Sequence, residues 1–260
     1  MAGSYRRVNP EDFPHFDAGL KLAWAKKHLE AFDVEVGKFL KGKTHTSWTE
    51  DDLDAGEYVL HLEPEPIPVE IGLTAGDAIA CLRASLDHLA CALTKTPLGT
   101  PNHKASFPII PTDSSDGLKL LKKCVSGIPT DAIKIIKALQ PYNDGDAYKF
   151  TKLWKLHRLW NIDKHRRIPL HGTAAQIPVT FPPDMPPISG GTDNSGIMRF
   201  PLAAKPYVQF NPAVKINVYL GDKSEGIFVS AGELVEIYKF VHHSVFPMFG
   251  EFFKNFKRPG

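Results

Sequence analysis

The segment from residue 73 to residue 95 constrains this chain most, because a helix there would be apolar on nearly every side. At about 100° per residue, one narrow stripe collects the large aliphatic side chains, Ile79, Leu82, Leu86, Leu89 and Leu93. A helix of this kind is normally buried, and charged side chains are seldom buried without a partner. Arg83, Asp87 and His88 are therefore predicted either to pair tightly or to line a cavity.

Further helices are predicted on both sides of this segment. In the first, residues 17–41, Leu20, Ala23, Trp24, Leu29 and Phe32 recur at roughly helical spacing. The last begins with a capping box formed by Ser230 and Glu233, and Pro247 predicts a kink in it. This last helix is predicted at 231–255, and two further helices at 129–139 and 148–167. Extended segments are predicted at 57–62, 176–181, 197–202, 207–210, 215–220 and 227–229.

These elements predict an α+β fold, a helical bundle with a small antiparallel β-sheet. We expect one domain over residues 1–260, with the bundle core at 15–170 and 230–255 and a β-rich insertion at 174–229.

Composition narrows the function classes. The 260 residues include 31 Lys and Arg against 29 Asp and Glu, a net charge of +2, which argues against a dedicated basic nucleic-acid binder but not against local phosphate binding. Apolar runs long enough for a membrane span and a signal-peptide pattern are both missing from the sequence, so no membrane association is expected. Three cysteines without C-x-x-C spacing suit a reduced protein, and we expect a cytoplasmic location.

The predicted helix at 148–167 carries the string HRLWNIDKHRR, which is dense in groups that bind or protonate a phosphodiester. A plainer interpretation exists, because cations near a helix C-terminus favour the negative end of its dipole. That interpretation explains the last residues of the string but not His157 or Asn161. The candidate substrate-binding set is His157, Arg158, Asn161, Asp163, Lys164, His165 and Arg166.

Two R-x4–6-H patterns resemble the signature of HEPN-type proteins. One is LRASLDHL at 82–89, where four residues separate Arg83 from His88, and the other has six residues between Arg158 and His165. An ordered set of motifs also resembles a widespread family of uncharacterised bacterial proteins. That set comprises Gly76-Asp77, LRASLDH at 82–88, FPI at 107–109, LQPY at 139–142 and LHRLWNIDKHR at 156–166.

The HEPN resemblance implies a helical bundle, often a homodimer whose motifs face across a cleft. It implies a metal-independent endoribonuclease without a cofactor, acting on RNA by attack of the 2′-OH. His88 would be the general acid or base, Arg83 the phosphate clamp and Asp87 the group that orients them. Because positions five apart lie about 140° apart around a helix, a symmetry mate would have to supply the second group, or the long Arg83 side chain would have to wrap around.

Two alternatives stay open. Other HEPN-type proteins have lost catalysis and act as binding, assembly or antitoxin partners, in which case the Arg, Asp and His residues form a buried structural network. A metal site in the bundle is the less favoured alternative, because H-x-x-x-H and E-x-x-H pairs are missing; its ligands would be Asp87, His88, His157, Asp163 and His165. The pattern leaves defence, toxin–antitoxin and housekeeping roles open.

Overall fold

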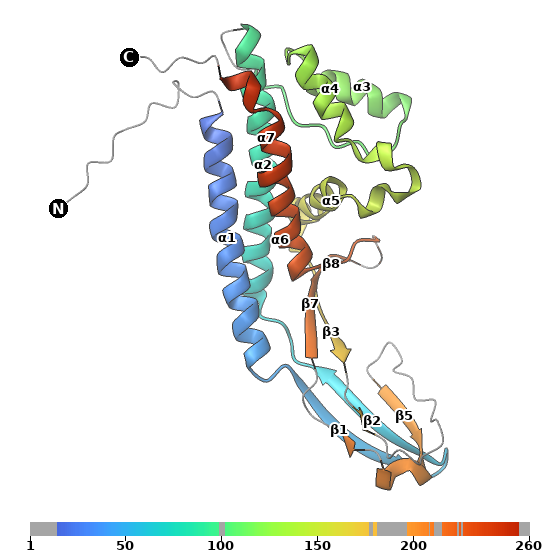
Figure 1. Cartoon of the computed structure of the whole chain (residues 1–260). Coiled ribbons are helices and arrows are strands. Elements are labelled where there is room, and N and C mark those ends of the chain that lie inside the picture. Colours follow the sequence, from blue (N-terminus) through green and yellow to red (C-terminus); the bar gives the residue numbers. More distant parts are fainter. Residues whose placement is uncertain are drawn as a thin grey trace, which may run out of the picture.

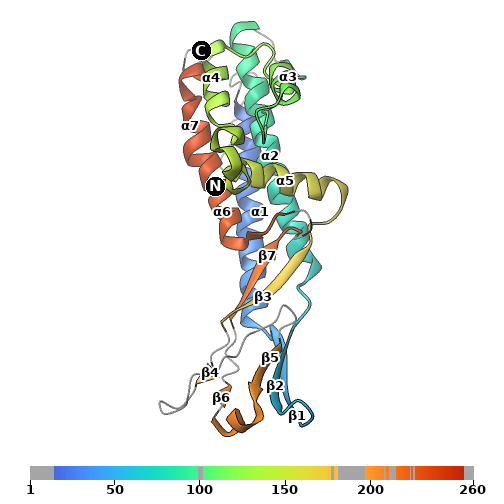
Figure 2. The ribbon, with the colours of Figure 1, turned by 90° about the vertical axis from the view of Figure 1, so that its right-hand side faces the viewer.

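The structure is a computed structural model that describes residues 15–98, 102–176, 179–180, 197–207, 209–210, 215–222, 224 and 226–254. The fold is α+β, as predicted: long helices form one end of an elongated molecule, and small antiparallel sheets form the other (Figures 1 and 2). No helix within these residues is both long and apolar enough to cross a membrane.

Three long helical segments run side by side (Figure 1). The predicted helix at 73–95 is present and begins four residues earlier, directly after Pro68. Its predicted core stripe is fully buried. The bounds are Phe16–Lys41 for α1, Val69–Leu98 for α2 and Ala231–Phe240 for α6, and α6 continues through a π-helical turn at Val241–Val245, α7 at Phe246–Met248 and a 3-10 turn at Gly250–Phe253.

The last helical segment confirms the capping box and the break near Pro247. Ser230 Oγ accepts from the backbone of Glu233, whose carboxylate accepts from the backbone of Ser230. The π-helical turn lies just before Pro247, and the helix tightens to 3-10 geometry beyond it. A proline inside a helix removes one backbone donor and crowds the preceding turn, which accounts for an irregular ladder at this point.

The predicted helix at 17–41 is present as α1, but the part of the predicted stripe that contains Leu20 and Trp24 is wrong. Leu20 is 51% exposed and Trp24 is 52% exposed. The pattern offered two stripes on different sides of the helix, and the one that packs against α2 and α6 includes two alanines. It consists of Ala18, Leu22, Ala25, Leu29, Phe32 and Val36.

A group of shorter helices, α3 to α5, follows α2. The sequence predicted a helix from residue 148, but α5 begins at Lys152, where the Thr151 hydroxyl accepts from the backbone of Trp154. The residues just before it form a 3-10 segment instead. The bounds are Ser115–Cys124 for α3, Thr130–Ala138 for α4, Pro141–Phe150 for the 3-10 segment and Lys152–His165 for α5.

The strands do not form one self-contained insertion. A hairpin of β1 (His45–Asp52) and β2 (Glu57–Pro64) precedes α2, and β5 (Ile197–Pro201) joins it by pairing with β2. β1 went unpredicted because its sequence, HTSWTEDD, is mostly polar and exposed. A second sheet has the order β3-β7-β8 and a third pairs β4 with β6; their bounds are Leu170–Gln176, Lys215–Leu220, Val229–Ser230, Val179–Thr180 and Gln209–Phe210. Much of the predicted insertion, including residues 181–196, lies outside the described residues.

Candidate functional site

The Arg83 guanidinium on α2 is sealed inside the protein, and the expectation that it opens onto a crevice is wrong. Only 6% of the residue is exposed. Nη1 donates to Asp87 Oδ1 at 2.7 Å, and Nη2 donates to the carbonyl oxygen of Phe107 at 2.8 Å. The indole of Trp160 on α5 lies against it, with Cζ 5.4 Å from the ring centroid. Both terminal nitrogens are therefore already engaged within the chain.

Asp87 fixes the same backbone segment from the other side. Its Oδ1 accepts from the backbone N–H of Phe107 at 2.9 Å, so Arg83 and Asp87 together hold both polar groups of one peptide residue. Gln140, only 1% exposed, continues the pattern: its Oε1 accepts from Ile110 N, and its Nε2 donates to Pro108 O. Three of the motifs that carry the family resemblance thus meet at one extended segment, and each is explained by backbone hydrogen bonding.

His157 lies on the inner face of α5, beside Trp160 and Asn161. The Asn161 amide nitrogen lies 3.1 Å from Nε2 and donates to it, which places the imidazole proton on Nδ1. That Nδ1 is buried and makes no hydrogen bond to the described residues. Burial lowers the pKa of His157 to about 4, and the positive charges of Arg83 and then Arg158 add to the shift. His157 is therefore a neutral side chain at physiological pH.

His88 does not meet Arg83. It is half-buried and lies five residues further along α2, on the side of the helix that carries Cys81, Ala84 and Cys91. Within the described part of the chain its imidazole makes no hydrogen bond or ion pair. Within one protomer, Arg83 and His88 therefore lie on different sides of α2, as expected for positions five residues apart on a helix.

The outer face of α5, unlike the buried network around Arg83, borders an open depression. Its end forms a depression of about 330 Å³, lined by Arg158, Asn161, Ile162, His165 and Arg166. Arg166 also donates to Asp222 at 2.9 Å across the loop after β7. The pKa of Asp222 is lowered by hydrogen bonds from Ser224 and further by Arg166. Asp222 was missed from the sequence because it lies 56 residues away in a short loop.

The remaining two residues of the candidate set have separate positions. Lys164 is exposed, and its ammonium lies 5.2 Å from the centroid of Trp160. The Asp163 carboxylate packs on the backbone of α2 at Gly76, where any Cβ would collide with it. Burial raises the pKa of Asp163, and the nearby charge of Asp77 raises it further. Gly76 is thus required for close packing of α5 on α2.

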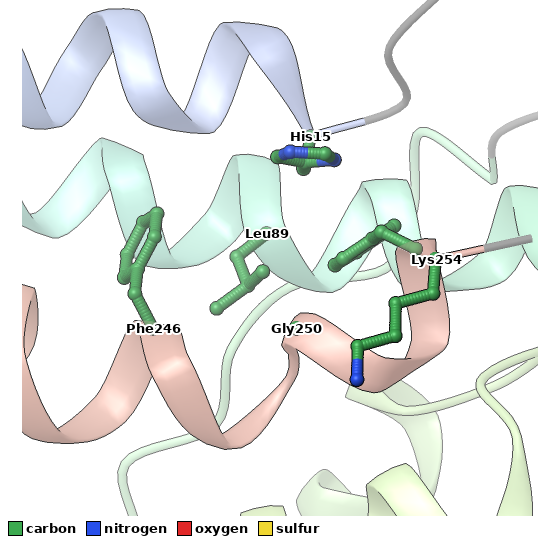
Figure 3. A pocket seen from close by; sticks show the side chains of 6 residues that line it. His15, Leu89, Phe246, Gly250 and Lys254 are labelled. Carbon is green, nitrogen blue, oxygen red and sulfur yellow. The ribbon is translucent and has the colours of Figure 1, made fainter. Parts of the chain in front are cut away.

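A second depression of about 330 Å³ lies at the far end of the bundle (Figure 3). His15 at the start of α1, Leu89 on α2 and Phe246 on α7 line it together with Gly250, Phe253 and Lys254. The His15 ring packs on Phe253 with centroids 4.6 Å apart, and burial lowers the pKa of His15. Its walls are mostly apolar, and Arg83 and His88 are not among its lining residues.

The hypothesis of a metal site in the bundle gains no support from the structure. In the described ranges, no three His, Cys, Asp or Glu side chains are grouped so that they could hold a metal ion. Comparison with known proteins adds no family. No protein-family model matches the chain, and searches of curated proteins and of solved structures give no match either. The site must therefore be interpreted from its own geometry.

Proposed function

We propose that this chain is a non-catalytic, HEPN-like binding module that holds phosphate groups of RNA on the outer face of α5. The observation that carries the proposal is the engagement of both Arg83 Nη atoms by Asp87 and the Phe107 carbonyl. A phosphate clamp needs convergent N–H donors at a surface that a ligand can reach. Recruiting Arg83 to a substrate would mean breaking its pair with Asp87, whose side chain is 32% exposed, and leaving a buried guanidinium without its acceptor, at a cost of up to about 3–5 kcal/mol.

The outer face of α5 places cationic side chains beside an open depression, which the buried network does not. Arg158, His165 and Arg166 converge on the depression, and its volume is at the small end of ligand sites in general, roughly 300–1,000 Å³. Arginine donates in a planar fork that matches phosphate oxygens, and the half-buried Asn161 amide adds a polar group at the same edge. The net charge of +2 suits a few local phosphate contacts rather than a long basic groove.

The test is binding of a fluorescent single-stranded RNA, followed by anisotropy at several salt concentrations. The double variant Arg158→Glu, His165→Glu is expected to weaken binding at least about tenfold and to lower the salt slope, since single strands lose roughly 0.7 in slope per phosphate contact. The double variant Lys134→Glu, Lys137→Gln on α4 changes the net charge by the same amount, with histidine counted as neutral, and serves as the control. Equal weakening by both variants would contradict a localised site.

The same RNA also tests the ribonuclease alternative, which one observation favours: the half-buried His88 imidazole is not bonded to described residues. The proposal expects the labelled RNA to stay intact during long incubation without metal. Metal-independent cleavage that disappears in His88→Ala, with the fold unchanged by circular dichroism, would replace the binding module by the enzyme. Cleavage that survives in His88→Ala would be assigned to a contaminant.

A further inference from the structure

The exposed side of α1 carries a second regular seam that its own bundle does not use. The buried positions of α1 follow each other at spacings of four and three residues. Leu20, Trp24, Lys27, Ala31, Val34 and Lys38 repeat the same spacing two residues later, on the opposite side of the helix. A four-three repeat of apolar residues is the pattern by which one helix packs along another.

Exposure shows that this second seam is uncovered. Leu20, Trp24 and Val34 are 51%, 52% and 55% exposed, and Ala31 is exposed between them. Large apolar side chains grouped in this way on a surface usually mark an interaction site.

We infer that a second copy of this chain covers the seam, with the two α1 helices antiparallel about a two-fold axis. In such a pair the numbers of opposing residues have a constant sum. Placing Trp24 opposite Val34 of the other copy sets that sum at 58, puts Lys27 opposite Ala31 and brings Lys27 beside Glu30. The two-fold axis repeats the Lys27–Glu30 pairing, so the seam is complementary to itself in charge, and the same register places Leu20 opposite Lys38 of the other copy.

The charges within one copy leave these groups available. Lys27 lies over the face of Trp24, with Nζ 4.4 Å from the ring centroid, so its ammonium lies within the seam. Among the residues that the structure describes, Glu30 forms an ion pair with Lys26 that is long, at 3.6 Å, and exposed, so this pair contributes little to stability. Both can therefore exchange partners when the copies meet.

This interface differs from the dimer that the HEPN resemblance implies, and it does not depend on the proposed function. α1 lies on the side of α2 away from α5 (Figure 1). Pairing through α1 therefore leaves the depression at the end of α5 open in each of the two copies. The seam from Leu20 to Lys38 is about 27 Å long at 1.5 Å per residue. One helix face of that length is smaller than the roughly 800 Å² that each partner contributes to a standard interface, so we expect micromolar affinity.

Sedimentation velocity between about 1 and 200 µM, the range expected for such an interface, tests the inference directly. The full-length protein is expected to pass from monomer to dimer within this range. Leu20→Lys is expected to weaken dimerisation at least about tenfold. Leu120→Lys on α3 is the matched control, because Leu120 is also 51% exposed on a helix, and it should change the constant less than about twofold.

Charge reversal tests the register. Lys27→Glu and Glu30→Lys should each weaken the homodimer, because like charges then face each other, whereas an equimolar mixture of the two variants should dimerise again. A monomer throughout the range would overturn the inference, as would equal effects of Leu20→Lys and Leu120→Lys. Failure of the mixture to dimerise would overturn the antiparallel register.

Discussion

The two faces of α5 share one short sequence string yet have opposite environments. On the inner face, His157 and Trp160 pack beside the buried Arg83 guanidinium, and every described contact there is internal. On the outer face, Arg158 and His165 border an open depression. The comparison shows that a residue type does not define a role. A buried cation whose two terminal nitrogens donate within the chain supports the fold, and a cation at an open surface can bind a ligand.

The largest expected difference between the faces comes from removing a partner of the buried charge. Asp87→Ala leaves Arg83 Nη1 and the Phe107 N–H without their shared acceptor, and should lower the free energy of unfolding by up to about 3–5 kcal/mol. Urea denaturation measures it. Asp131→Ala is the matched control, since it removes a carboxylate paired with Lys134 at 2.8 Å on an exposed helix face, and it should cost less than about 1 kcal/mol. Similar losses in the two variants would contradict a structural role for the Arg83–Asp87 pair.

Acid should act on the inner face through His157. Its pKa is about 4 in the folded chain and about 6.5 in the unfolded chain, so between these values only the unfolded chain binds the proton. Stability should therefore fall as the pH drops from about 6.5 to about 4, by about 2–3 kcal/mol. His157→Gln should remove this part of the pH dependence. Parallel stability curves for the two proteins over that window would refute the prediction.

Close packing of the inner face on α2 gives a smaller effect. Gly76→Ala places a methyl group against the Asp163 carboxylate and should cost about 1–3 kcal/mol in unfolding free energy. Adding Asp163→Ala should recover part of the loss. Gly19→Ala on α1 has open space around it and should instead stabilise the protein by about 0.5–1 kcal/mol, because alanine favours the helix. Destabilisation by both alanines would show that the Asp163 contact is not the cause.

How much of this arrangement the sequence could predict depends on the range of the interactions. The buried stripe of α2 and the capping box at Ser230 follow from local spacing, and both were predicted correctly. The i,i+4 pairing of Arg83 with Asp87 was also one of the predicted options. The backbone of Phe107, which makes that pair a sealed network, lies 24 residues from Arg83 in an extended segment with no periodic signal.

The prediction of which face of α1 is buried was partly wrong for a different reason. Its sequence carries two seams at the same spacing, and local pattern does not say which one its own bundle buries. The predicted set mixed the two, since Leu29 and Phe32 belong to the buried seam and Leu20 and Trp24 to the exposed one. Strand β1 was not predicted for another reason: it is a polar edge strand, and its pairing with β2 depends on the turn between them.

The smallest expected effect on stability belongs to the outer face, and it separates the two roles most clearly. His165 is exposed at the end of α5, so His165→Ala should change the unfolding free energy by less than about 0.5 kcal/mol. The same variant should weaken RNA binding measurably, and more at low salt than at high salt, because salt competes with contacts to phosphate at the depression. A variant that unfolds would place His165 in the structural network with Arg83, and one that folds and binds RNA normally would remove it from the binding surface. Only a folded protein with weaker, less salt-dependent binding supports the division of α5 into a structural face and a binding face.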